Sequence, residues 1–254
     1  MRPIIFLISL FLSFSTYSTE EIIQRKNYTL SYNEDHEVAN WVAYELDHEK
    51  LQNCVKRRNN FRIDPDISTG SAAPEDYKNS GYDRGHLVPA GDMKHTREAM
   101  NDTFYYSNMS PQPPRFNQGI WARLEHLMRS WGIKYKSILL ITGPVLKDNL
   151  PSIGVRNDVS VPEEYFKLIL RKQGQSWEGI AFIMKTDVTS TDLRSYVTSI
   201  DTVERKTGID FFKDLPDEVE EDVESKFNIK NWDFSGRFEY LPCRTSVTQQ
   251  RKWY

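Results

Sequence analysis

The sequence lacks an apolar run long enough to anchor the chain in a membrane. The apolar segment of residues 4–12 is interrupted by Ser9, whereas a membrane-spanning helix needs about twenty apolar residues. No cysteine follows this segment directly, which argues against a lipoprotein anchor. These absences argue against a membrane protein and leave the amino terminus to be interpreted from its flanking residues.

The same segment is typical of a secretory signal peptide. Arg2 forms a short positive region before it, and the small residues Thr16 and Ser18 follow at suitable positions before a cleavage point. A buried first strand is the structural alternative. We predict a cleaved signal peptide over residues 1–18 and a mature chain of residues 19–254. That chain would be secreted or periplasmic, with no membrane attachment after cleavage.

The sequence also has little net charge. Lysine and arginine number 33 against 36 aspartate and glutamate residues, which gives a formal net charge of −3. Proteins that coat nucleic acid electrostatically are usually strongly basic. The balance therefore argues against such a coat protein, although an enzyme with a local basic groove stays compatible with it.

Only two cysteines, Cys54 and Cys243, are present. After export they could form one disulfide that closes most of the chain, but the sequence does not give their distance, so both states stay open. By contrast, 13% of the residues are aromatic and 39% are hydrophobic, enough for a sizeable core with strands. No internal repeat or second linker divides the sequence, so we predict a single α+β domain.

Hydrophobic periodicity predicts a mixture of strands and helices. Alternation over Tyr28–Tyr32 indicates a strand, whereas the pattern of Trp41–Leu46 is compatible with a strand or a helix. Apolar residues at three- and four-residue spacing predict a helix that begins at Asn117 and that Gly132 ends. Further strands are expected at residues 104–106, 136–145, 165–170 and 180–184, and further helices at residues 98–100, 199–206 and 216–226.

Residues 83–93 are predicted to form a turn-rich segment that carries His86. Arg84 and Gly85 directly precede this histidine, and a cation two residues away would lower its pKa and keep the imidazole neutral near pH 7. A neutral imidazole can deprotonate water. The remaining four histidines are interpreted as structural or surface residues: His36, His48, His95 and His126.

Asn117 and Glu125 are candidates for holding a hard metal ion. An amide oxygen is an acceptable ligand for Mg²⁺, although asparagine is also a favoured helix N-cap. Glu125 lies about 80° around a regular helix from Asn117, close enough to hold a metal-bound water, and a solvated carboxylate is the alternative. Asn108 could orient His86 or a phosphate, or it could satisfy backbone groups in a turn.

Three strings in this sequence resemble the DNA/RNA non-specific endonuclease family, which includes the secreted Serratia nuclease and mitochondrial endonuclease G. They are residues 83–86 (DRGH), 107–112 (SNMSPQ) and 117–125 (NQGIWARLE). The resemblance covers nearly the whole mature chain and is closest to the family's secreted bacterial branch. It implies a ββα-metal fold, in which a strand pair and one helix cradle the metal beside an antiparallel sheet. It also makes Trp41–Leu46 a strand.

The resemblance implies a role for each site residue. His86 matches the family's general base, Asn117 its direct magnesium ligand, and Glu125 the acidic residue that binds the metal through water. Arg84 matches an arginine near the phosphate, and Asn108 matches a further site asparagine. The implied cofactor is Mg²⁺, with Mn²⁺ as a substitute.

A further family arginine precedes an aromatic-x-x-Asp-Pro string, which is Phe61–Pro65 here. A gapless match would place this arginine at Asn59, so the spacing departs from that of the family. We assign it to Arg58, with Arg57 as the alternative. The other basic residues nearby are interpreted as solvated surface.

The sequence hypothesis is a secreted, Mg²⁺-dependent endonuclease that hydrolyses phosphodiester bonds in DNA and RNA and leaves 5′-phosphates. His86 would deprotonate the attacking water while arginines stabilise the charged transition state. The alternatives are an inactive nucleic-acid-binding protein of the same fold and a hydrolase of a smaller phosphodiester. Because members of this family are often dimers, the resemblance also suggests a homodimer.

Overall fold

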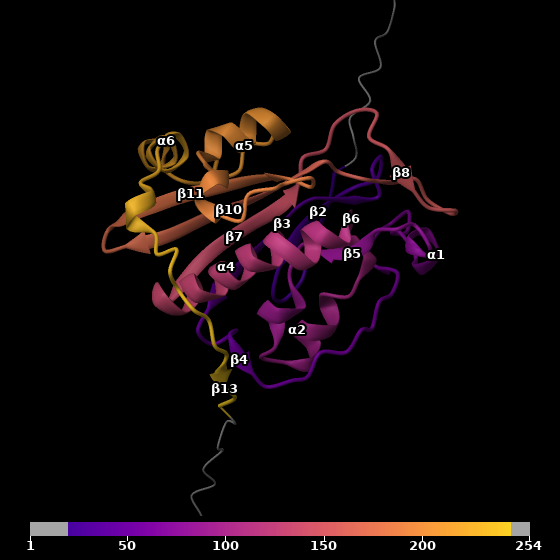
Figure 1. Cartoon of the computed structure of the whole chain (residues 1–254), viewed down its shortest axis with the longest axis horizontal. Helices are drawn as coiled ribbons and strands as arrows, with labels where there is room; N and C mark the ends of the chain where they lie inside the picture. The colour runs from indigo at the N-terminus through magenta and orange to yellow at the C-terminus, as the bar shows by residue number, and fades with distance from the viewer. Residues whose placement is uncertain (1–19, 245–254) are drawn as a thin grey trace, which may run out of the picture.

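The computed structural model describes residues 20–244 and has a seven-stranded antiparallel sheet at its centre (Figure 1). The predicted signal peptide of residues 1–18 lies outside the described residues. The long segment of residues 48–136, which connects the third and fourth strands in the spatial order of this sheet, carries the predicted site residues. In spatial order the strands are β1 (Glu20–Gln24), β2 (Thr29–Asn33), β3 (Val38–Asp47), β7 (Ser137–Pro144), β10 (Glu164–Gln173), β11 (Ser176–Lys185) and β12 (Val197–Thr198).

Helices cover both faces of the sheet (Figure 1). α4 (Ala122–Lys134) lies on one face, and α5 (Ile200–Thr207) and α6 (Asp217–Ser225) pack on the other. This arrangement confirms the α+β prediction. Among residues 20–244, no helix has the length and hydrophobicity needed to cross a bilayer. The shorter elements are α1 (Pro74–Tyr77), α2 (Arg97–Asp102), α3 (Pro114–Phe116), β4 (Gln52–Asn53), β5 (Asp83–His86), β6 (Met109–Gln112), β8 (Ser152–Ile153), β9 (Val159–Ser160), β13 (Leu241–Pro242), and 3₁₀ turns at Ala90–Met93, Tyr106–Asn108, Leu193–Tyr196 and Ile229–Asn231.

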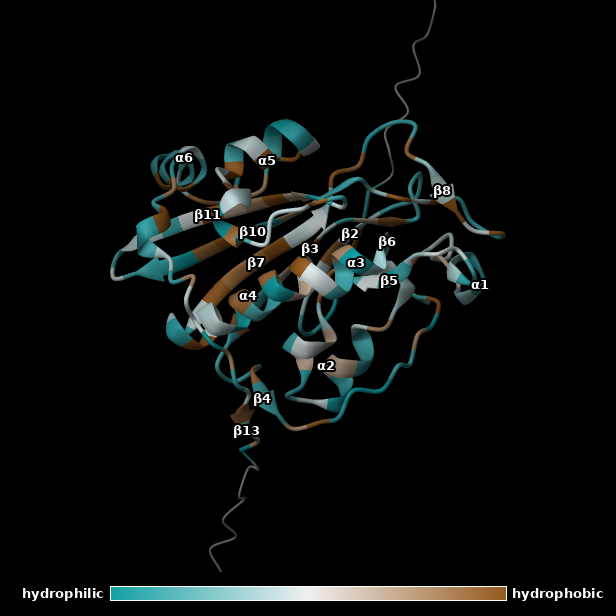
Figure 2. Ribbon diagram, viewed as in Figure 1, coloured by the Kyte–Doolittle hydropathy of each residue, from teal (hydrophilic) through white to brown (hydrophobic). Residues whose placement is uncertain are grey.

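β10 illustrates a central strand that is buried along nearly its whole length and apolar over most of its middle (Figure 2). Successive side chains of a strand point to opposite faces. Tyr165 and Ile169 pack in the core beneath α4, whereas Phe166 and Leu168 pack in the core beneath α5 and α6. Lys167 shares the α4 face and is fully buried. A strand covered on both faces therefore carries a fully buried cation, Lys167, on the side of the predicted site.

The segment predicted to be turn-rich at residues 83–93 begins as a strand, so that prediction was wrong for residues 83–86. β5 pairs antiparallel with β6, which places Asp83 opposite Gln112 and His86 opposite Met109. A Cβ atom at Gly85 would lie 2.3 Å from the Gln112 side chain. Gly85 is therefore required for close approach of the neighbouring strand and not for a turn.

The helix expected to begin at Asn117 opens with a wide π-helical turn over Asn117–Trp121 before α4. Single π-helical turns of this kind occur frequently at functional sites. Gly132 does not end the helix, which continues to Lys134. A Cβ atom at Gly132 would lie 3.2 Å from the carbonyl oxygen of Leu46. The prediction of a terminal glycine was wrong, because this glycine allows α4 to pack closely on β3.

Most other predicted elements are confirmed. Trp41–Leu46 lies inside β3, and the two runs around Gly174 form the β10–β11 hairpin. The short strand expected at residues 104–106 was wrong, since Tyr105 forms only an isolated bridge with Arg62. The aromatic side chains in this stretch are buried by tertiary packing, which explains a strand-like composition without a strand.

Cys54 and Cys243 form a disulfide across a sequence separation of 189 residues. The bond stands beside β4 and β13, two short strands that pair in parallel. A loop of this length restricts the unfolded chain enough to stabilise the fold by about 5 kcal/mol. The structure thereby decides between the two states that the sequence left open.

Candidate active site

Two adjoining cavities contain most of the predicted site residues. The smaller, called the site cavity, has a volume of about 250 Å³ and is lined by Arg57, Arg84, His86, Pro89, Ala90, Gly91, Asn117, Ala122, Glu125, His126 and Arg129. The larger, called the outer groove, has a volume of about 650 Å³ and is lined by Arg57, Asn59, Phe61, Pro74, Tyr77, Lys78, Asn79, Tyr82, Asp83, Arg84, Asn117 and Gln118. Arg57, Arg84 and Asn117 line both, so the two cavities form one continuous depression.

His86 lies at the end of β5 and is only 9% exposed. Its ring meets Phe104 edge to face at 5.0 Å between centroids and lies 5.8 Å from Phe61. Burial, with smaller contributions from the charges of Arg57 and Arg84, lowers the pKa of His86 to about 3, while a backbone hydrogen bond with Arg84 acts in the opposite direction. The predicted neutral imidazole is therefore explained mainly by burial, and the nearby arginine is a lesser cause.

The Nε2 atom of His86 is buried and has no hydrogen-bond partner within the described part of the chain. A buried polar atom usually has a partner, so an isolated one calls for an explanation. In a neutral imidazole, one nitrogen carries a lone pair that accepts a proton. The free nitrogen at the cavity is thus able to receive a proton from a bound water.

Asn117 is held in a defined orientation by Asp83. Its Nδ2 atom donates a hydrogen bond of 2.8 Å to Asp83 Oδ2, and Gln118 Nε2 donates one of the same length to the same oxygen. The side chain of Asn117 caps no helix, which excludes the N-cap alternative. Because Asp83 binds the NH₂ end of the amide, the Oδ1 atom is the end left for a ligand.

Glu125 stands on α4 within the site cavity, and its carboxylate has no hydrogen bond or salt bridge to another described side chain. Burial raises its pKa to about 7, while Arg129 and Lys167 act to lower it. A cation that binds beside a buried carboxyl group lowers its pKa and favours its charged form. Glu125 and Asn117 are accordingly the oxygen donors of this cavity that could hold a metal ion.

A buried ion pair lies beneath Glu125. Arg129 Nη1 and Asp92 Oδ1 are 2.7 Å apart, both almost fully buried, and the Tyr44 hydroxyl donates to the other Asp92 oxygen at 2.8 Å. Lys167, from β10, lies 4.6 Å from the centre of the Trp121 ring. This network anchors α4 to the sheet and supplies positive charge below the cavity.

The structure brings Arg57 to the site and leaves Arg58 outside. Both side chains are exposed, but Arg57 lines both cavities and lies 5.2 Å from the centre of the Phe104 ring, whereas Arg58 lines neither cavity. Arg84 lines both cavities as well, with its guanidinium 4.1 Å from the Phe61 ring. The assignment of the upstream arginine to Arg58 is therefore corrected to its alternative.

Asn108 is fully buried and does not line either cavity. Its side-chain oxygen accepts a hydrogen bond from the Val88 nitrogen at 2.9 Å, and its Nδ2 donates to the carbonyl oxygens of Val88 and Thr103. These bonds fit the alternative role of Asn108, in which its side chain satisfies polar groups of the backbone. Asn108 thus fixes the chain two residues beyond His86 and contacts no substrate space.

Two site residues were missed from the sequence, Asp83 and Arg129. Asp83 is the first residue of the DRGH string and orients Asn117 across 34 positions of sequence. Arg129 follows Glu125 by four residues, a spacing that places both on one helix face, and that signal could have identified it. His126, interpreted as a surface histidine, also lines the site cavity.

The chain is similar to known nucleases over most of its length. The sequence profile of the DNA/RNA non-specific endonucleases matches residues 11–218. Nuclease C1 of Cunninghamella echinulata var. echinulata is 34% identical over 214 residues, which cover 78% of this chain and 85% of that protein. Human mitochondrial endonuclease G is 32% identical over 209 residues, which cover 77% and 70% of the two chains.

A solved structure is similar as well. A chain in the crystal structure of the EndoG/EndoGI complex superposes with a TM-score of 0.71 at 29% identity, covering 79% of this chain and 89% of that chain. The resemblance first seen in the DRGH string and its neighbours is thereby confirmed over most of the chain. The chain belongs to the DNA/RNA non-specific endonuclease family of nucleic-acid hydrolases.

Proposed function

We propose that this nuclease is a Mg²⁺-dependent endonuclease that hydrolyses phosphodiester bonds of both DNA and RNA and leaves 5′-phosphates. The observation that carries this proposal is the neutral His86, whose buried Nε2 atom has no partner in the described structure. The free oxygen of Asn117 and three arginines line the same cavity. A base, an oxygen donor and cations are the groups that such a hydrolysis needs.

His86 is the proposed general base. Its Nε2 atom would accept a proton from water as the water oxygen attacks phosphorus, a contribution of typically about 10²–10⁴ in rate. In the free protein Arg57 and Arg84 help to hold the pKa of His86 low. A phosphate bound against these arginines would neutralise their charge and raise the basicity of the imidazole. His86 would therefore gain basicity when substrate is present.

The metal part of the proposal rests on the oxygen donors. Asn117 offers its amide oxygen, since Asp83 engages the NH₂ end, and Glu125 offers a carboxylate in the same cavity. Magnesium prefers such ligands and retains several waters, and Mn²⁺ suits the same donors. When bound, the ion would act as a Lewis acid that stabilises charge on phosphoryl oxygens.

Arg57, Arg84 and Arg129 are the proposed cationic groups around the scissile phosphate. Preorganised cations stabilise the negative charge that develops in the transition state. In the outer groove, Lys78 and Tyr82 supply a further cation and a flat aromatic surface, which suit a phosphate backbone and a stacked base. Contacts of this kind carry no direct base readout, which supports low sequence preference.

The proposal also includes export of the protein and its assembly into a homodimer. The predicted signal peptide of residues 1–18 motivates a secreted or periplasmic location, and the family resemblance motivates a homodimer. Immunoblotting of cell fractions and light scattering of the purified mature chain are the corresponding measurements. A protein found only in the cytoplasm would contradict the first, and a monomer at all concentrations would contradict the second.

Digestion of circular plasmid, linear DNA and RNA, with Mg²⁺ and with EDTA, tests the proposed activity. We expect all three polymers to be cut with Mg²⁺ and none with EDTA. Cleavage of the circular plasmid would show that the action is endonucleolytic. An inactive binding protein would shift these substrates on a gel without shortening them, and metal-independent cleavage would contradict the proposed cofactor.

The two neighbouring arginines should differ sharply in effect. Arg57→Ala should lower kcat by about 10²-fold, as expected for loss of one preorganised charge at the transition state. Arg58→Ala should change it by no more than about twofold, because an exposed charge outside the cavity contributes little. Steady-state kinetics on plasmid DNA at fixed ionic strength measures both. A larger loss in the Arg58 variant would restore the assignment made from sequence.

A further inference from the structure

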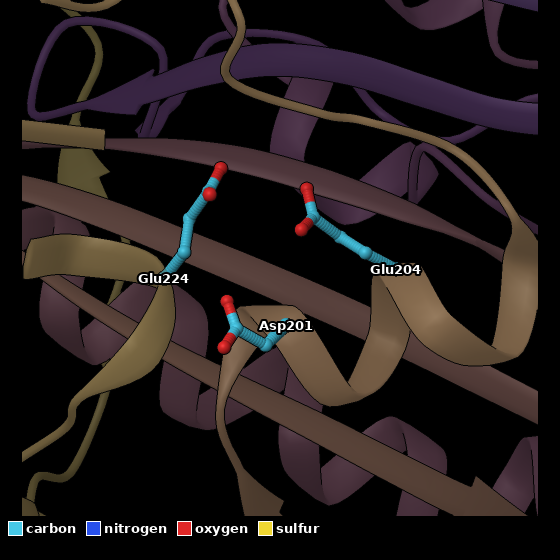
Figure 3. A group of neighbouring side chains, drawn as sticks. All are labelled: Asp201, Glu204 and Glu224. Carbon is cyan, nitrogen blue, oxygen red and sulfur yellow. The ribbon is translucent and has the colours of Figure 1, made fainter. Parts of the chain in front are cut away.

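A second group of carboxylates lies on the face of the sheet opposite α4. Asp201 and Glu204 stand on α5 and Glu224 stands near the end of α6. One oxygen from each residue lies within 4.8 Å of the others. Figure 3 shows the three carboxylates turned toward one another across the space between the helices. The group is remote from the site cavity in the fold, because the sheet separates α5 and α6 from α4 (Figure 1).

Glu224 is the unusual member of this group. It is only 8% exposed, and its Oε1 atom is buried with no hydrogen-bond partner in the described structure. Burial of a carboxylate without a partner is costly. The close packing of α6 on β11 keeps it there, since a Cβ atom at Gly179 would lie 2.4 Å from the carbonyl oxygen of Val223. The Glu224 carboxylate thus belongs to the cluster, and one of its oxygens is unsatisfied by the described part of the protein.

Negative charge exceeds positive charge around these oxygens. Glu224 also belongs to a second triad with Asp210 and Glu220. In the described residues one salt bridge reaches the three central carboxylates, from Arg205 to Asp201 at 3.8 Å, and the Arg205 side chain is 67% exposed. Burial and the neighbouring acids raise the pKa of Glu224 to about 7. The cluster therefore has a deficit of cations.

We propose that Asp201, Glu204 and Glu224 bind one divalent cation of the calcium class between α5 and α6. The donors are all oxygens, which suits a hard cation and disfavours zinc, whose structural sites are built mainly from cysteine and histidine. Calcium accepts about six to eight oxygen ligands in a flexible geometry, whereas Mg²⁺ demands a near-ideal octahedron and usually retains several waters. Three carboxylates carried by two separate helices therefore suit calcium better.

The bound cation would fasten α6 to α5. Both helices cover the second hydrophobic core, to which they contribute Ile200, Val203 and Val223. Neutralising the carboxylates would remove their repulsion and link two elements separated in sequence. The site is structural in this proposal, so its loss should lower stability without abolishing cleavage of nucleic acid.

Thermal unfolding of the full mature chain carrying Asn117→Ala tests the proposal, because that substitution removes the proposed catalytic metal ligand. We expect about 5 mM Ca²⁺ to raise the Tm relative to EDTA by about 5 °C, for a Kd near 10⁻⁴ M. Adding Glu224→Gln should abolish this rise. It should also raise the Tm in EDTA, since the neutral amide relieves repulsion.

Two further variants keep the result interpretable. Glu221→Gln, an exposed position of α6 outside both triads, should retain the full response to Ca²⁺. Asp201→Asn should reduce the response even if Glu224→Gln does not fold. Calorimetric titration should show one fewer Ca²⁺ bound in the Glu224→Gln chain than in its parent. A Tm unaffected by Ca²⁺, or a response unchanged by Glu224→Gln, would overturn the proposal.

Discussion

Replacing His86 by alanine should lower kcat for nucleic-acid cleavage by about 10²–10⁴-fold, the usual contribution of a general base. The reason is the loss of the one buried, neutral imidazole nitrogen that faces the site cavity without a partner. Metal binding and the fold should persist, because His86 makes no contact with the side chains of Asn117 or Glu125 that the structure records. Single-turnover kinetics on plasmid DNA, with calorimetric titration of Mg²⁺, would measure both properties.

His36→Ala is the matched control for this variant. His36 is a half-buried histidine whose pKa is also lowered by burial, but it bonds to Ser160 and stands outside both cavities. We expect its removal to leave kcat within about threefold of the parent, in keeping with general-base effects being confined to groups in reach of the water. Equal losses in the two variants, or full activity of His86→Ala, would eliminate His86 as the base.

The buried state of His86 also has a consequence for stability. Its pKa is about 3 in the folded protein and about 6.5 in the unfolded chain. The stabilisation from keeping the imidazole neutral is complete above pH 6.5 and is lost as the pH falls through the folded value. Between pH 7 and pH 5, the unfolding free energy of the parent should therefore fall by roughly 2 kcal/mol more than that of His86→Ala. Parallel denaturant titrations would measure this difference.

Replacing Asn117 by alanine should remove most of the stimulation by Mg²⁺ and lower kcat by at least about 10²-fold, since Lewis-acid stabilisation is worth several kcal/mol. The physical reason is the loss of the free amide oxygen in the site cavity. Calorimetric titration should show weaker Mg²⁺ binding in this variant. Unchanged affinity for the metal would mean that other atoms hold the ion.

Gln118→Ala provides the control for Asn117→Ala. Gln118 is the next residue in sequence and donates a hydrogen bond of the same length to the same Asp83 oxygen. Gln118→Ala removes one of the two hydrogen bonds to Asp83, as Asn117→Ala does, but it removes no oxygen atom from the site cavity. We expect Mg²⁺ affinity and kcat to change by less than about fivefold, a loss of the order of one hydrogen bond. A loss as large as that in Asn117→Ala would assign the effect to Asp83 instead.

Much of the fold could be predicted from local sequence patterns. The helix expected at residues 199–206 is α5, whose N-cap Ser199 accepts a side-chain hydrogen bond from the Thr202 nitrogen and which ends at Gly208 with φ of 72°. These are short-range signals with a direct conformational cause. The patterns failed where packing overrode them, as at Gly132, where a residue that often ends helices instead lets α4 approach β3.

The site could be predicted in part, again from the types and spacing of its residues. The residue types and spacing of His86, Asn117 and Glu125 indicated a base and oxygen donors, and all three line one cavity. The choice between Arg57 and Arg58 could not be made, because adjacent residues in an irregular segment point in different directions. Asn108 looked equally suited to a site role and to the backbone role that its hydrogen bonds have.

The sequence by itself determined the chemical groups that this protein has available: a histidine beside an arginine, an asparagine eight residues before a glutamate, and a family pattern that joins them. Such information is local, because the order and spacing of residues carry it. Only the tertiary structure decided which of these groups share a cavity, how deeply His86 is buried, and that Asp83 orients Asn117. It also brought Glu224 to the carboxylates of α5. These properties depend on contacts between residues far apart in the chain, and burial and packing set those contacts.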